Sequence, residues 1–176
     1  MKKEYIRKGI HTSLALLLAL VAPIASKELL IGFAVLLFIV FSIARALRFF
    51  KIARVPRVTF GELFFAVGVL AAIQIAWPNI ALFQVSMIVL ALADPTAAII
   101  GIPFGKHVYT VLDEKRSFEG SLACFVSAFV ILFFFGVPLL YGLLYAFILS
   151  LIEAFSLRGS DNLTLPIATI LLLSLA

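Results

Sequence analysis

Five separated segments of the sequence each carry a side chain suited to metal or phosphate chemistry. An ionised carboxylate near the centre of a membrane helix costs about 2.5–3.5 kcal/mol on insertion scales, so several in one apolar chain indicate a function. Together with nearby lysines they predict a site that binds a metal ion and phosphate. For Glu62 alone, an interhelical hydrogen bond or a helix cap is an equally good explanation. The residues are His11, Glu62, Asp94, Glu153, and the pair Asp161 and Asn162, with Lys106 and Lys115 as the lysines.

The stretch 94–120, DPTAAIIGIPFGKHVYTVLDEKRSFEG, is the centre of this prediction. It begins with Asp94 followed by Pro95, and proline both lacks the N–H that continues a helix and disfavours the α conformation of its predecessor. Asp at an N-cap with Pro at the first helical position is typical of a helix start. We therefore expect a broken helix whose second half opens at Pro95. Irregular backbone at membrane depth must be covered by protein or line a wet cavity, so we expect the site there.

Two interpretations fit the segment Gly101-x-x-x-Gly105-Lys106. A Gly-x-x-x-Gly pair in an apolar run is often a helix-packing face, whereas Pro103 between the glycines favours a turn. The segment is not a Walker A loop, because its spacing is one residue short and His107 replaces the Ser or Thr. As a turn, it predicts a backbone that approaches phosphate closely, with a lysine at its end.

The composition identifies an integral membrane protein. Of the 176 residues 64% are hydrophobic, and the mean hydropathy is +1.22, which excludes a soluble domain. The only cysteine, Cys124, lies in an apolar run, so no disulfide framework is expected. We predict one all-α domain, residues 1–176, a polytopic helix bundle. Seven apolar segments are candidate spans, and most reach the length of about 20 residues needed to cross a bilayer; the last, with 14 residues, falls short unless the bilayer is thinner there. They are 9–25, 28–47, 60–77, 80–102, 120–137, 138–155 and 163–176.

The basic residues predict the orientation of this bundle. If the N-terminus is cytoplasmic, every Lys and Arg except Lys27 falls in a cytoplasmic segment, as the positive-inside rule requires. This placement, rather than nucleic-acid binding, accounts for the net charge of +5. Basic residues within 45–57 predict attraction to anionic membrane lipids. The acids listed above fall on the same side. The cytoplasmic segments are 1–8, 45–59, 103–119 and 156–162.

Several motifs together resemble one family. D94PTAAIIGIPFGKH, K115RSFEGS, Glu153 and D161NLTLP are similar to the CTP-dependent lipid-alcohol kinases, with Arg7-Lys8-x-x-His11 and Gly61-Glu62 also fitting. These are the dolichol kinases, phytol kinases and yeast-type diacylglycerol kinases, which are related to phosphatidate cytidylyltransferases. The resemblance implies CTP as phosphate donor, Mg²⁺, and a membrane-embedded isoprenoid or lipid alcohol as acceptor. The chain is far shorter than dolichol kinases and corresponds to little more than a catalytic core.

Phosphoryl transfer needs a metal bridge, neutralised phosphates and a positioned acceptor hydroxyl. We expect Asp94 and Asp161 to bind the metal, with Asn162 supporting. The base that accepts the hydroxyl proton is Glu119, Glu153 or His11, and the sequence does not choose among them. The phosphates are expected to contact Lys106, Lys115, the backbone of Gly101, Gly105 and Gly120, and, closing the site, Arg7 and Lys8.

The sequence is also compatible with two other functions. A cytidylyltransferase would use the same nucleotide but leave CMP on the lipid. A cation-coupled transporter would use intramembrane acids, but such proteins place them near the midplane and often show inverted repeats. Here the acids gather on one side and no repeat is visible, so a kinase is favoured.

Overall fold

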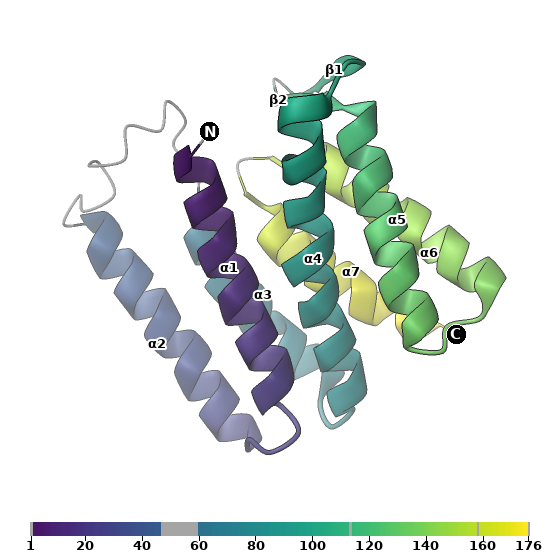
Figure 1. Ribbon diagram of the computed structural model, residues 1–176. Coiled ribbons are helices and arrows are strands. Elements are labelled where there is room, and N and C mark those ends of the chain that lie inside the picture. Colours follow the sequence, from purple (N-terminus) through teal and green to yellow (C-terminus); the bar gives the residue numbers. More distant parts are fainter. Residues whose placement is uncertain (1, 47–59, 113, 158, 176) are drawn as a thin grey trace.

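The computed structural model describes residues 2–46, 60–112, 114–157 and 159–175, except for the side chains of residues 2–5 and 7. The described chain is dominated by helices, which confirms the all-α prediction (Figure 1). Its elements are α1 (Lys2–Val21), α2 (Lys27–Ala46), α3 (Gly61–Ala76), α4 (Ile80–Phe104), β1 (Val108–Val111), β2 (Glu114–Ser117), α5 (Phe118–Phe134), α6 (Leu139–Phe155) and α7 (Asp161–Leu173).

Helix α4 lies in the middle of the bundle, in contact with α1, α5 and α7 (Figure 1). Helix α3 packs between α2 and α7, and α6 packs on α5 and α7. Buried apolar residues from all seven helices form one core. The N-terminus and the β-hairpin lie at one end of the bundle, and the connection from α1 to α2 lies at the other (Figure 1).

Two of the described helices, α2 and α4, are long and apolar enough to cross a membrane by length and composition. The apolar parts of the other five are shorter, including Lys8–Val21 of α1, so seven complete spans remain a prediction. Helix α2 buries only Leu30 and Ala34 in the protein. Its outer face and those of α5 and α6 expose many large apolar side chains, Phe38, Phe134 and Leu140 among them. Apolar surface of this extent indicates contact with lipid.

The predicted break at Asp94 is wrong, because α4 runs without interruption through Pro95 and Pro103. Pro95 cannot donate to the carbonyl of Ala91, four residues earlier. The hydroxyl of Thr12 on α1 donates to that carbonyl instead, at 3.0 Å. A neighbouring helix thus satisfies the acceptor that the proline leaves open, and the helix continues.

A β-hairpin replaces the loop expected at 103–119. Strands β1 and β2 are antiparallel, with Val108 opposite Ser117 and Thr110 opposite Lys115. The β1 sequence, VYTV, consists of β-branched and aromatic residues that favour strands. Because successive side chains of a strand point to opposite faces, Lys115 and Arg116 point in opposite directions.

Candidate functional site

An ion pair between α1 and α4 lies at the hairpin end of the bundle. Nζ of Lys8 is 2.7 Å from Oδ1 of Asp94, and the two side chains are 11% and 7% exposed. Nζ also lies 3.4 Å from the backbone carbonyl oxygen of Asp94. The Asp94 side chain is therefore engaged with a lysine and does not cap a helix.

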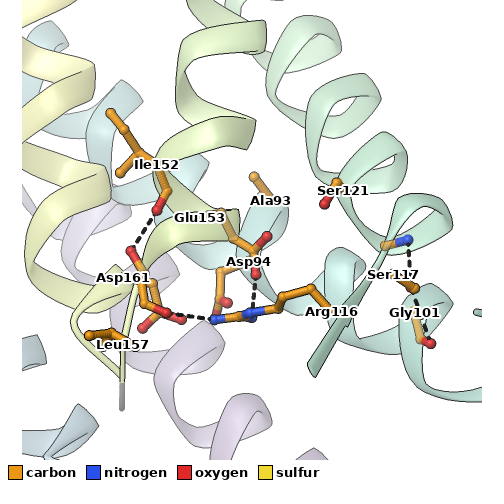
Figure 2. A network of polar contacts seen from close by, with 12 residues as sticks. Ala93, Asp94, Gly101, Arg116, Ser117, Ser121, Ile152, Glu153, Leu157 and Asp161 are labelled. Carbon is orange, nitrogen blue, oxygen red and sulfur yellow. Dashed lines mark hydrogen bonds and ion pairs between the residues drawn. The ribbon is translucent and has the colours of Figure 1, made fainter. Parts of the chain in front are cut away.

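A second ion pair connects the hairpin to α6. Nη1 of Arg116 is 2.6 Å from Oε1 of Glu153, and Nη2 donates to the carbonyl of Ser156 at 2.9 Å. Figure 2 shows Arg116 extending from the hairpin toward Glu153, with Asp94 and Asp161 in the same view. The Nε atom of Arg116 is buried and, within the described chain, has no hydrogen-bond partner.

The start of α7 contributes Asp161 and Asn162, which are both buried. Oδ1 of Asp161 accepts from the N–H of Asn162 at 2.9 Å. Nδ2 of Asn162 donates to the carbonyl of Gly61 at 3.0 Å and lies 3.4 Å from Nδ1 of His11. The His11 ring stacks on Phe65, with 5.2 Å between ring centroids. These contacts bring α1, α3 and α7 together at one point.

Glycine makes this junction possible. Gly159, in the turn before α7, has a φ of +90°, and a Cβ there would lie 2.6 Å from the Cα of Gly61. Only glycine accepts both this conformation and this distance without strain. The turn therefore rests directly on the start of α3 and fixes where Asp161 and Asn162 begin α7.

The charged groups of the site act on one another. Asp161 interacts electrostatically with Asp94, Lys8, Arg116 and Glu153. Burial alone would lower the pKa of Arg116, but the carboxylates around it, above all Glu153, more than offset this, and its pKa is raised. Arg116 therefore stays a cation at any physiological pH.

The carboxylates of Asp94 and Asp161 suit a magnesium ion. Mg²⁺ prefers oxygen ligands and is usually held by one or two carboxylates together with substrate phosphates. The described residues contain no group of three or more His, Cys, Asp and Glu that could hold a metal by itself. In the same part of the chain no Lys or Arg forms a salt bridge with Asp161. A two-carboxylate site completed by phosphate fits these residues.

The chain was compared with known proteins. No protein-family profile matches it, and no solved structure does. A phytol kinase of Synechocystis sp. is 30% identical over 130 residues, which cover 67% of this chain and 55% of that protein. This match supports a relation to the lipid-alcohol kinases. The chain thus spans about half the length of this lipid-alcohol kinase, and relations to dolichol kinases, diacylglycerol kinases and cytidylyltransferases remain predictions.

The glycines of the expected phosphate loop form a packing contact. A Cβ on Gly101 would lie 2.9 Å from Oγ of Ser117, and one on Gly120 would lie 2.8 Å from the carbonyl of Ala97. Gly105 is the C-cap of α4 and faces Ser117. The turn expected at Pro103 is absent, because this proline lies inside α4. The structure therefore favours the helix-packing interpretation, in which small residues let the hairpin and α5 approach α4.

The remaining predicted residues lie at the edge of the site. Lys106 and Lys115 are exposed, and Glu62 is half-buried in the first turn of α3. The side chain of Arg7 lies outside the described residues. Oε1 of Glu119 lies 2.8 Å from Nδ1 of His107, and both its carboxylate oxygens accept from the His107 N–H at 3.3 Å.

These hydrogen bonds hold the pKa of Glu119 at about 2. The largest contribution comes from a bond to its own backbone N–H, and the next from the His107 side chain. An efficient general base has a pKa near the operating pH. Of the three candidate bases, Glu119 is therefore the least suited.

Sequence reasoning missed Arg116 and Thr12. Arg116 was overlooked because the segment was expected to be a loop, in which Lys115 and Arg116 are equivalent. The β-branched and aromatic residues of VYTV indicate a strand, and the partner strand of a hairpin would then run through EKRS, where only one of the two basic residues faces inward. Thr12 gave no signal, because its role depends on a proline in another helix.

Proposed function

We propose that this chain phosphorylates a membrane-embedded lipid alcohol, with CTP as donor, at the cytoplasmic end of the bundle. This proposal rests on two ion pairs, Lys8–Asp94 and Arg116–Glu153, and on the buried acid Asp161, which interacts electrostatically with all four residues. Phosphoryl transfer is catalysed mainly by positioning and by charge stabilisation, which such a cluster supplies. The relation to the lipid-alcohol kinases adds the class of acceptor.

Each charged residue has a role in this proposal. Asp94 and Asp161 hold Mg²⁺, which neutralises charge on the phosphates of the bound nucleotide. Arg116, a cation fixed in place by Glu153 and Ser156, faces the phosphates. Lys106 and Lys115 lie at the rim and attract the nucleotide from solution.

The acceptor hydroxyl needs a base because it is uncharged. His11 and Glu153 are the candidates inside the cluster, since both are buried. The isoprenoid or acyl tail of the acceptor lies among the lipid-facing apolar side chains. Its hydroxyl reaches the cluster from the bilayer side.

The orientation follows from the charges. The basic residues in the first two turns of α1 and in the hairpin lie toward the same end of the bundle, and by the positive-inside rule this supports a site in contact with the cytoplasm. The nucleotide then reaches the site from the compartment in which it is made.

The deciding experiment uses purified protein in lipid nanodiscs with Mg²⁺ and CTP labelled at the γ-phosphate. Phytol, geranylgeraniol, a polyprenol, dolichol and diacylglycerol are offered separately, with ATP in parallel. We expect label in one class of lipid, release of CDP, and no reaction after chelation of Mg²⁺. Asp94→Asn is the matched control and should lose activity by about 10²-fold or more, since it removes a charge used in the transition state. Pyrophosphate release with cytidine in the lipid would instead identify a cytidylyltransferase.

A further inference from the structure

Lys8 is bonded to the Asp94 carboxylate, which in the proposed function holds a metal ion. Its Nζ lies 2.7 Å from Oδ1 and 3.4 Å from the carbonyl oxygen of the same residue. An ammonium group is a compact point charge on a flexible stem. Two cations close to one carboxylate repel each other strongly where little water screens them. Binding of a metal ion to Asp94 and retention of Lys8 therefore oppose each other.

We propose that Lys8 competes with the divalent cation for Asp94 and makes metal binding conditional on the nucleotide. Without substrate, the ammonium neutralises the Asp94 carboxylate. When a metal–nucleotide complex binds, Lys8 leaves Asp94 for a phosphate oxygen and the metal takes its place. This inference rests on the proposed function and adds the order in which its parts assemble.

The charges of the cluster support this exchange. Among the described residues, the cluster places two cations, Lys8 and Arg116, beside the acids Asp94 and Glu153. A divalent cation alone would add positive charge next to these two cations, and a bound phosphate would offset it. Metal and phosphate together are thus stabilised more than the metal alone.

The exchange requires only a side-chain movement. One turn after Lys8, Thr12 binds the Ala91 carbonyl and holds α1 against α4. Near the other end of α1, Nε2 of Gln84 donates to the Ala19 carbonyl at 2.9 Å. The helix is therefore fixed at both ends of its contact, while the four-carbon stem of Lys8 can change rotamer.

The test measures metal binding without nucleotide, using Mn²⁺ and its electron paramagnetic resonance signal. Lys8→Gln should bind Mn²⁺ about tenfold more tightly than wild type, a coupling typical of two ligands competing for one site. Lys27→Gln, at the opposite end of the bundle, is the matched control and should bind like wild type. Adding Asp94→Asn to Lys8→Gln should abolish the gain. Equal or weaker Mn²⁺ binding by folded Lys8→Gln would overturn the proposal.

A second measurement uses the wild-type chain and so does not depend on a variant that folds. Acylation of lysines by a succinimidyl ester, read by mass spectrometry, should rise at Lys8 when Mg²⁺ is added and stay constant at Lys27. No change at Lys8 at saturating Mg²⁺ would overturn the competition. The kinase assay stays independent: competition without lipid phosphorylation refutes the proposed function, whereas phosphorylation without competition refutes only this inference.

Discussion

Arg116 and Glu153 lie 2.6 Å apart, from Nη1 to Oε1, and this contact joins the β-hairpin to the last turn of α6. The second nitrogen of the same guanidinium donates to the carbonyl of Ser156, just beyond the helix end. Carbonyls at a helix C-terminus lack partners within the helix, so the arginine also acts as a cap. One side chain thereby sets the distance between the hairpin and the acids of the site.

Replacing Arg116 by Ala should lower the free energy of unfolding by about 3 kcal/mol, because Glu153 is left buried without its counter-charge. Arg116→Lys should lose less, since lysine keeps the charge but lacks the planar fork that reaches both partners. Lys115→Ala, on the exposed face of the same strand, should change stability by less than about 0.5 kcal/mol. Denaturation in detergent micelles measures all three. Equal stability of the Arg116→Ala and Lys115→Ala proteins would show that the ion pair contributes nothing.

Thr12 compensates for Pro95 within α4. Thr12→Val keeps the shape of the side chain but leaves the Ala91 carbonyl without the donor now at 3.0 Å. We expect a loss of about 1–3 kcal/mol, the usual cost of an unsatisfied buried acceptor. Thermal unfolding in detergent measures this cost.

The control is a double-mutant cycle with Pro95→Ala. Alanine at position 95 supplies the missing N–H to the Ala91 carbonyl, so Thr12→Val should cost clearly less in that background. If the cost of Thr12→Val is the same with Pro95 and with Ala at 95, the hydroxyl does not compensate for the proline.

The convergence of the polar residues was predictable, because polar residues in an apolar chain are few and have to meet. Asp94, Glu153, Asp161 and His11 were expected to converge from distant segments; Asp161 interacts electrostatically with Asp94 and Glu153, and His11 contacts Asn162. Their roles in a site remain a prediction. The number and approximate places of the helices followed from the lengths of the apolar runs.

What failed depended on partners that are remote in sequence. The rule that proline ends a helix is local, and it was overridden by Thr12, some eighty residues away. The glycines at 101 and 105 allowed two interpretations, and only the position of Ser117 decides between them. The choice of Arg116 over Lys115 required the strand register.

Helix α3 packs closely against the start of α7 at Gly68, and a substitution of this glycine should reveal how closely. Pro166 leaves the Asn162 carbonyl without its helical donor, and this oxygen lies where a Cβ on Gly68 would stand, with the Cα of Leu163 3.0 Å away. Gly68→Ala should therefore cost about 1–3 kcal/mol and displace the start of α7. Gly32→Ala is the matched control, because a Cβ at that position would have nothing within 4 Å, and it should gain up to about 1 kcal/mol of helix propensity. Thermal unfolding of both variants in the same detergent distinguishes packing from propensity.

The orientation can be tested in intact cells by cysteine labelling. Residues 79 and 112 are both exposed, and lie before α4 and at the tip of the hairpin. A membrane-impermeant maleimide should modify Asn79→Cys from outside but leave Leu112→Cys unlabelled until the membrane is opened, as the positive-inside rule predicts. The native Cys124 is buried and serves as the background. Labelling of position 112 from outside would place the site on the wrong face for cytoplasmic nucleotide.

Glu119 is not expected to be the general base that accepts the proton of the acceptor hydroxyl. The pKa of Glu119 is about 2 in the folded protein, below the ordinary 4.5. The hydrogen bonds that the Glu119 carboxylate accepts, first from its own backbone N–H and then from His107, therefore add stability above about pH 4.5, and this contribution is lost as the pH falls toward 2. Between pH 5 and 9 the charge of Glu119 does not change, so Glu119→Gln should leave the shape of the pH–rate profile as it is and lower kcat by less than about 10²-fold. Glu153→Gln and His11→Gln are tested beside it, and the true base should lose about 10²–10⁴-fold in kcat together with one limb of the profile. If Glu119→Gln alone produced that loss, the half-buried carboxylate beside His107 would be the base, and the acceptor hydroxyl would have to approach at the hairpin rather than from within the bundle.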